Sequence, residues 1–182
     1  NVAIGYNTLA ANTTASQNLA MGYNALAIQT TDGAFNTAVG SYTLDNNTIG
    51  DKNVALGYVA LTQNSEGSNN VGIGSSSSKS NSTGSSNTSA GNSSLYSNTS
   101  ANYNTAIGAE ALFSNMSGIN NTAIGYRALY DNAVGRNNTA IGFNAGNSGI
   151  DNDQEADNWR NRISIGFSAL CKENNSAQIG NS

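Results

Sequence analysis

The sequence predicts an all-β protein, a parallel β-solenoid of about eleven coils. Three observations lead to this fold. A short motif ending in glycine recurs along nearly all of the 182 residues, mostly at intervals of 17. An apolar residue stands directly before each of these glycines, and a leucine usually stands four residues after it. A fixed period of this kind is the signature of repeat architectures, in which each coil stacks on the next.

The repeat is marked by the last glycine of segments such as NVAIG, NLAMG and NTAIG, which we call the repeat glycine. The first eight spacings between repeat glycines are 17 or 18 residues, and they are followed by one of 24 and one of 14. So regular a series is not an accident of composition. The repeat glycines are Gly5, Gly22, Gly40, Gly57, Gly74, Gly91, Gly108, Gly125, Gly142, Gly166 and Gly180.

Two apolar columns are predicted to form the structural core. The Ile column stands directly before the repeat glycine and comprises Ile4, Met21, Val39, Leu56, Ile73, Ala90, Ile107, Ile124, Ile141, Ile165 and Ile179. The Leu column stands four residues after it and comprises Leu9, Leu26, Leu44, Leu61, Leu95, Leu112, Leu129 and Leu170, with Ser78 and Gly146 as exceptions.

Each coil is predicted to contain two short strands. The NTAIGY stretch alternates with period two, so the residues one and three before the repeat glycine face one way and the alanine between them faces the other. A second strand is predicted around the Ala-Leu pair that follows the glycine. The remaining Asn, Ser and Gly residues suit tight turns.

An asparagine stands four residues before each of the first nine repeat glycines, from Asn1 to Asn138. Stacked coils bring these side chains into register, where their amides can bond to one another along the rod. The alternative is that they are turn residues without a ladder. Triplets of the form Asn-x-Ser/Thr, for example at Asn12, Asn81, Asn98 and Asn115, arise by chance in so Asn-rich a chain and do not imply glycosylation.

The Ser-rich stretch 68–102 has the composition of a flexible linker. However, Asn70, Gly74, Asn87 and Gly91 keep the 17-residue period through it. We therefore interpret residues 1–148 as one continuous array with a weakly packed waist, where Ser78 replaces Leu and Ala90 replaces Ile. Residues 163–182 form the final coils.

Residues 149–162 interrupt the period, and we expect this insertion to project from the rod as the point of specific contact. The spacing of its acids resembles a calcium loop, but Ala156 and Arg162 stand where that loop requires Gly and Glu. A solvated acidic loop is one alternative, and a Trp159 side chain that folds back as a plug is another. The candidate contact residues are Asp151, Asp153, Glu155, Asp157, Trp159 and Arg160.

Composition excludes several function classes. The chain has no His and a single Cys, so it lacks the residues for a Ser-His-Asp relay or a thiolate metal cluster, and we expect no cofactor and no enzymatic activity. Acidic residues outside the insertion are too isolated for paired-carboxylate hydrolysis. A net charge of −4 argues against nucleic acid, and no apolar run is long enough to span a membrane. Cys171 is interpreted as a small buried hydrophobe. The absence of an initiator Met suggests a piece of a longer chain.

One chain supplies only about two large apolar side chains per coil, and their burial does not offset the cost of ordering 17 residues. We therefore expect a partner chain. The residue directly after the repeat glycine is a candidate contact, although it could instead be an edge of the chain's own core. This aromatic column includes Tyr6, Tyr23, Tyr58, Tyr126, Phe143 and Phe167.

The repeats NTAIGYRAL, NTAIGAEAL and NVALGYVAL resemble the heads of trimeric autotransporter adhesins. They are still more similar to repeats of trimeric phage tail-fibre proteins that carry a C-terminal intramolecular chaperone. The resemblance implies a left-handed parallel β-roll, three chains around one axis, and Ile-type residues packed inside. Adhesin heads have shorter coils of about 14 residues, so the 17-residue period favours the fibre type.

We therefore expect a structural and adhesive fibre segment, a rigid extracellular homotrimer about 50 Å long that contributes to binding a host receptor or glycan. An autotransporter head is the closest alternative. An ice- or carbohydrate-surface binder is another, because Thr37, Thr88, Thr105, Thr122 and Thr139 form a partial array three residues before the repeat glycine.

Overall fold

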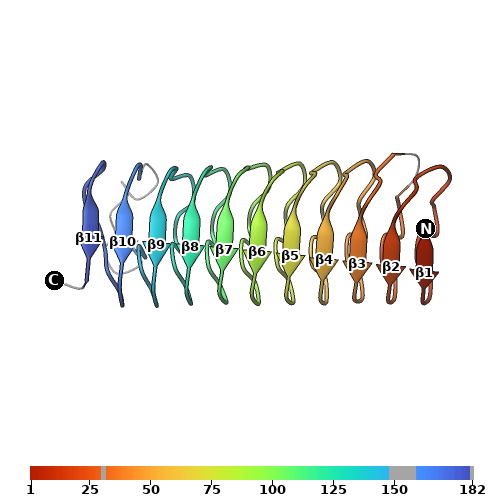
Figure 1. Ribbon diagram of the computed structural model, residues 1–182, viewed down its shortest axis with the longest axis horizontal. Coiled ribbons are helices and arrows are strands. Elements are labelled where there is room, and N and C mark those ends of the chain that lie inside the picture. The colour runs from red at the N-terminus through yellow and green to blue at the C-terminus, as the bar shows by residue number, and fades with distance from the viewer. Residues whose placement is uncertain (30–31, 148–158, 181–182) are drawn as a thin grey trace.

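A computed structural model of the chain describes residues 1–29, 32–147 and 159–180. Within these ranges the chain has eleven strands of three residues each and no helix, and the strands lie side by side along a straight rod (Figure 1). The strands are β1 (Val2–Ile4), β2 (Leu19–Met21), β3 (Thr37–Val39), β4 (Val54–Leu56), β5 (Val71–Ile73), β6 (Thr88–Ala90), β7 (Thr105–Ile107), β8 (Thr122–Ile124), β9 (Thr139–Ile141), β10 (Ile163–Ile165) and β11 (Ala177–Ile179).

The strands form one parallel sheet in sequence order, which confirms the β-solenoid with a repeat of about 17 residues. Each strand pairs with the same three positions of the next coil, as Ile107 does with Ile124. Strands β5 and β6 continue this register through the Ser-rich stretch, with Val71 opposite Thr88. The 24-residue interval is also bridged in register, because Ile163 pairs with Thr139.

The predicted second strand is wrong. The Leu-column residues of seven coils have φ between 47° and 51°, in the left-handed region that a strand does not use. The returning half of each coil is therefore a series of turns. It is held to the next coil by backbone bonds, such as the one from Leu112 N to Ala128 O at 2.9 Å. The left-handed turn directs the leucine into the interior.

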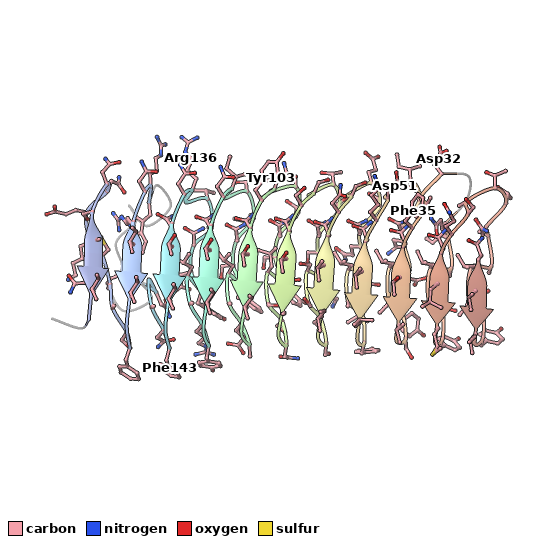
Figure 2. All side chains as sticks on the ribbon, viewed as in Figure 1. Asp32, Phe35, Asp51, Tyr103, Arg136 and Phe143 are labelled. Carbon is pink, nitrogen blue, oxygen red and sulfur yellow. The ribbon has the colours of Figure 1, made fainter. Side chains whose placement is uncertain are left out.

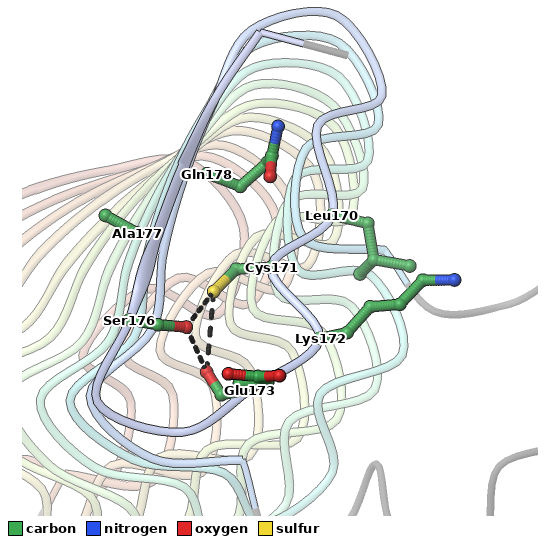
Figure 3. Close-up of a pocket in the computed structure, with 7 residues that line it drawn as sticks. All are labelled: Leu170, Cys171, Lys172, Glu173, Ser176, Ala177 and Gln178. Carbon is green, nitrogen blue, oxygen red and sulfur yellow. Dashed lines mark hydrogen bonds between the residues drawn. The ribbon is translucent and has the colours of Figure 1, made fainter. Parts of the chain in front are cut away.

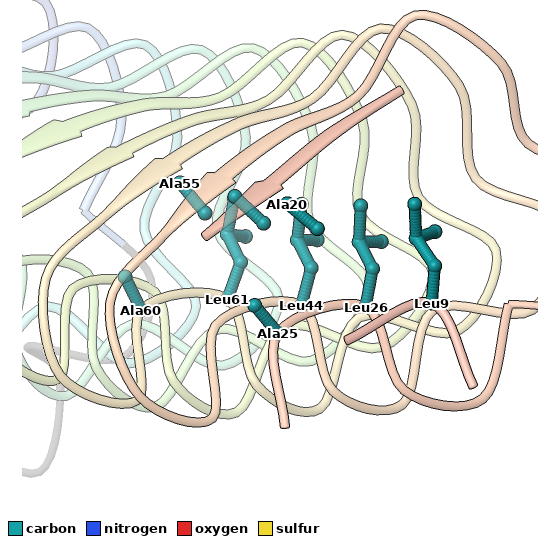
Figure 4. Packing of buried hydrophobic residues seen from close by; sticks show 9 residues of the cluster. Leu9, Ala20, Ala25, Leu26, Leu44, Ala55, Ala60 and Leu61 are labelled. Atoms are coloured by element: carbon teal, nitrogen blue, oxygen red, sulfur yellow. The ribbon is translucent and has the colours of Figure 1, made fainter. Parts of the chain in front are cut away.

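The interior of the chain is made of leucine and alanine (Figure 4). Leu26, Leu44, Leu61, Leu95 and Leu112 are all 0% exposed. They pack against the alanine in the middle of each strand, which is likewise 0% exposed in six coils. The Leu column from Leu9 to Leu129 thus lies in the interior of the single chain, whereas Leu170 is half-buried.

The Ile column, by contrast, does not lie in the interior of the single chain. Ile4 is 52% exposed, and Ile73, Ile107, Ile124 and Ile141 are between 37% and 41% exposed. Strand alternation directs these residues away from the alanine. The space between the sheet and the returning turns is narrow and holds mainly small residues and Leu, so the larger β-branched residues face outward.

The predicted asparagine ladder is present, and it bonds to backbone rather than only to other side chains. In Asn104, for example, Oδ1 accepts from Asn121 N at 3.0 Å and Nδ2 donates to Gly118 O at 2.8 Å. The same pair of bonds repeats from Asn18 to Asn121, with Ala101 in place of glycine in one coil. The ladder satisfies polar backbone groups that the turns would otherwise leave buried and unpaired.

A second asparagine ladder was not predicted. Asn47, Asn64, Asn81, Asn98, Asn115 and Asn132 stand seven residues after the repeat glycine and are buried. Asn98 Nδ2 donates to Asn81 Oδ1 at 2.6 Å and to Ala101 O at 3.1 Å. Asn81, Asn98 and Asn115 belong to the triplets described above, and their burial removes them from the surface that glycosylation requires.

Replacing Asn104 by Ala is expected to lower the free energy of unfolding by about 1–3 kcal/mol, because it leaves the buried Asn121 N–H without its acceptor and removes one of the two bonds to Gly118 O. Thermal and urea unfolding followed by circular dichroism would measure the loss. Asn92→Ala is the matched control, since Asn92 is exposed and its side chain makes only long bonds, 3.4 Å to Ser75 O and 3.3 Å from Ser93 Oγ. Equal losses for the two variants would contradict the structural role of the ladder.

Candidate functional site

The outward face of the sheet is the most extensive feature of the rod that the interior does not explain. It carries the Ile column and, two residues earlier in each strand, a Val/Thr column made of Val2, Leu19, Thr37, Val54, Val71, Thr88, Thr105, Thr122, Thr139 and Ile163. Most Val/Thr-column residues are half-buried by their neighbours in the sheet. Together the two columns form a continuous strip along the whole described rod.

The aromatic column lies beside this strip, at the turn where each strand ends. Figure 2 shows Phe143 at this turn, opposite the edge that carries Asp51, Tyr103 and Arg136. The rings of Tyr6 and Tyr23 stack with centroids 5.2 Å apart. Phe143 stacks with Phe167 at the same spacing, 5.2 Å. The column is exposed, with Tyr6 at 71% and Phe167 at 67%, so it is not an edge of the chain's own core.

The strip is uncharged. Among the described residues, neither the two columns of the strip nor the aromatic column beside it contains Asp, Glu, Lys or Arg, although the chain has 18 such residues in all. Strips of exposed Ile, Val, Tyr and Phe are unusual on a free surface. We therefore take the Ile, Val/Thr and aromatic columns together as the outer face, the candidate functional surface.

The predicted contact loop is only partly described. Asp151, Asp153, Glu155 and Asp157 lie outside the described residues, so their role stays a prediction. Trp159 is 7% exposed, and its ring lies 4.1 Å from the guanidinium carbon of Arg162. The prediction of Trp159 as an exposed anchor is therefore wrong, while Arg160 is exposed.

Trp159 and Arg162 act as structural residues where the chain re-enters the stack. Trp159 O accepts from Asn138 Nδ2 at 3.0 Å, which is the bond that a glycine carbonyl makes in the coils before it. Arg162 takes the place of the ladder asparagine and donates to Cys171 O and to Asn174 Oδ1, each at 3.0 Å. The sequence contains a signal for this role, because Trp159 stands seven residues before Gly166, just as Gly118 stands seven residues before Gly125.

Another aromatic stack stands five residues after the repeat glycine, and Arg127, which contacts it, also lies 5.2 Å from the Tyr126 ring of the outer face. Tyr96, Phe113 and Tyr130 have centroid spacings of 5.0 and 5.1 Å. Arg127 lies 5.0 Å from the Tyr130 ring and bonds to Glu110 at 2.6 Å. The hydrogen bond to Glu110 is the main reason that the pKa of Arg127 is raised. Burial raises the pKa of Asp131, and the positive charge of Arg127 partly offsets this rise. Since cations and neighbouring rings cover the ring faces, this stack stabilises the coils.

A shallow depression lies at the β11 end of the described stack (Figure 3). Cys171 Sγ lies 2.9 Å from Ser176 Oγ, and Ser176 donates to Glu173 O at 2.6 Å. Cys171 is buried, as the sequence predicts. The depression is lined by Leu170, Cys171, Lys172, Glu173, Ser176, Ala177 and Gln178.

Among the described residues, no three His, Cys, Asp or Glu side chains lie close enough together to hold a metal ion. In that same part of the chain, no helix has the length and apolar character needed to cross a membrane. The chain matches no protein-family model, no curated protein and no solved structure.

Proposed function

We propose that the chain is a structural segment of an extracellular fibre, a rigid left-handed β-roll that assembles as a homotrimer through its outer face. The observation that carries the proposal is the uncharged apolar strip on a chain whose large buried apolar side chains are mainly leucines. The NTAIGY resemblance supports a fibre of the phage tail type that contributes to receptor binding and has no enzymatic activity.

A second copy of the chain fits the strip better than an unrelated partner. The strip repeats with every coil, and only a surface with the same coil spacing matches it along its full length. With strands about 4.8 Å apart, the two strand columns cover roughly 500 Å², and the aromatic column adds to this. In a trimer each chain shares this face between two neighbours. Identical uncharged faces meet without electrostatic repulsion.

The Val/Thr column favours parallel chains in register. Its first half is mostly apolar, with Val54 and Val71, and β6 to β9 carry only Thr. Antiparallel chains would place Val54 opposite Thr122 and Val71 opposite Thr105, which buries hydroxyls against methyl groups. Parallel chains place each threonine beside its own copies, where the hydroxyls can pair. An unpaired buried hydroxyl costs about 1–3 kcal/mol, so several mismatches decide the orientation.

Multi-angle light scattering on the folded protein tests the proposal. We expect a mass of three chains at micromolar concentration, and small-angle scattering should report a rod about 50 Å long. A stable, cooperatively folded monomer would overturn the proposal. An autotransporter head would give the same mass, and the sequence on either side of these residues would distinguish the two sources.

One other candidate function is a solenoid that binds ice or a carbohydrate surface. It is supported by the row of threonines in the Val/Thr column, Thr88, Thr105, Thr122 and Thr139. A flat, evenly spaced row of hydroxyls can match a lattice. This function needs the outer face to be free, so it predicts a monomer, together with loss of surface binding when Thr105 and Thr122 are replaced by Lys.

A further inference from the structure

The interior of the rod contains a cluster of buried hydroxyls between two apolar parts. Ser77, Ser78, Ser89 and Ser94 are each 2% exposed or less. In the other coils these positions hold mainly Ala and Leu. We call these four residues the serine seam.

The serine seam is one hydrogen-bonded network. Ser89 Oγ lies 2.6 Å from Ser77 Oγ and 2.8 Å from Ser78 Oγ, and it lies 3.1 Å from Val71 O. Ser77 Oγ lies 3.2 Å from Ser94 Oγ, which donates to Gly91 O at 3.0 Å. All four hydroxyls have partners, so the seam is a well-formed polar layer.

The apolar interior is interrupted at the seam. One buried cluster runs from Leu9 to Leu61 and a separate one from Leu95 to Ala145. The outer face changes at the same place, because Ala90 stands in the Ile column and Ser75 and Asn92 stand in the aromatic column. The sheet pairing and the hydrogen-bond ladders continue across it; for example, Asn87 N donates to Asn70 Oδ1 at 3.0 Å.

We propose that the serine seam divides the rod into two cooperative units that open separately, one before residue 75 and one after residue 94. In a solenoid each coil contacts only its neighbours, so cooperativity along the rod depends on the coupling at every interface between coils. At the seam this coupling lacks the leucine that couples neighbouring coils elsewhere. The backbone amides of residues 75–94 should therefore be the first in the regular array to open.

Hydrogen exchange of the assembled wild-type protein, read by mass spectrometry, tests the proposal directly. We expect peptides covering residues 75–94 to exchange at least tenfold faster than those covering 54–61 and 105–129. Differential scanning calorimetry should show two transitions. Uniform protection through the seam together with a single transition would overturn the proposal.

A repair variant tests the cause. Ser78→Leu combined with Ser77→Ala, Ser89→Ala and Ser94→Ala restores the residues of the neighbouring coils, and we expect one merged transition and at least tenfold slower exchange at 75–94. The matched control is Ser100→Leu with Ser117→Ala at exposed positions, which should leave two transitions. Two transitions in a folded repair variant would overturn the assignment to the serine seam. If the variant fails to fold, the wild-type exchange pattern decides alone.

Discussion

Ile124→Asp is expected to break the assembly into separate chains. Ile124 is 37% exposed in the single chain, so one chain accommodates a carboxylate there. In the proposed trimer the same position would be buried against its own copies, and three unpaired carboxylates would meet. Burying one unpaired charge costs several kcal/mol. Light scattering should show the mass falling by a factor of three at micromolar concentration.

Ser117→Asp is the matched control for Ile124→Asp. Ser117 is exposed at the turn on the other edge of the strands, away from the aromatic column. It should leave both the mass and the melting temperature unchanged. If Ile124→Asp remains a trimer of normal stability, the outer face is not the interface.

Gly108→Ala is expected to destabilise the rod by at least about 3 kcal/mol. Gly108 has φ +125°, a conformation that costs a side-chain-bearing residue about 1–3 kcal/mol. An added Cβ would also lie 2.5 Å from Gly125 O, so the next coil has to move. The strain falls on backbone rather than on a flexible side chain, and it would be measured as a lowered melting temperature.

The control for Gly108→Ala is Gly180→Ala. Gly180 also has a positive φ, +80°, but an added Cβ there would meet no atom within 4 Å. It should cost at most about a third of the loss. Similar losses would mean that coil-to-coil contact is not what requires the repeat glycines.

The strands and their register were predictable because the 17-residue period determines both. Once Gly108 and Gly125 are aligned, Ile107 must pair with Ile124, and the structure has this pairing. The period does not say which side of the strand faces inward, since alternation is symmetric. The interior side was misassigned for this reason: the larger Ile was expected inside, whereas the narrow coil holds the Ala between the two outward residues.

Other features needed backbone conformations that the sequence does not display. Leucine is rare at positive φ, so nothing in the Ala-Leu pair indicates a left-handed turn. The second asparagine ladder did have a signal, since Asn64, Asn81 and Asn98 are spaced by 17. That signal was hidden because Asn is also the commonest turn residue in the chain.

Disulfide trapping at the outer face tests the central proposal, that copies pack in parallel and in register through this face. In a Cys171→Ser background, Leu56→Cys and Ile124→Cys are made singly, with Ser117→Cys as the control. We expect each outer-face variant to form dimers on mild oxidation while the control does not. Parallel register brings each residue beside its own copies, whereas antiparallel chains would place Leu56 beside Ile124 and cross-link only a mixture of the two variants. A trimer in which neither single variant cross-links would contradict the account.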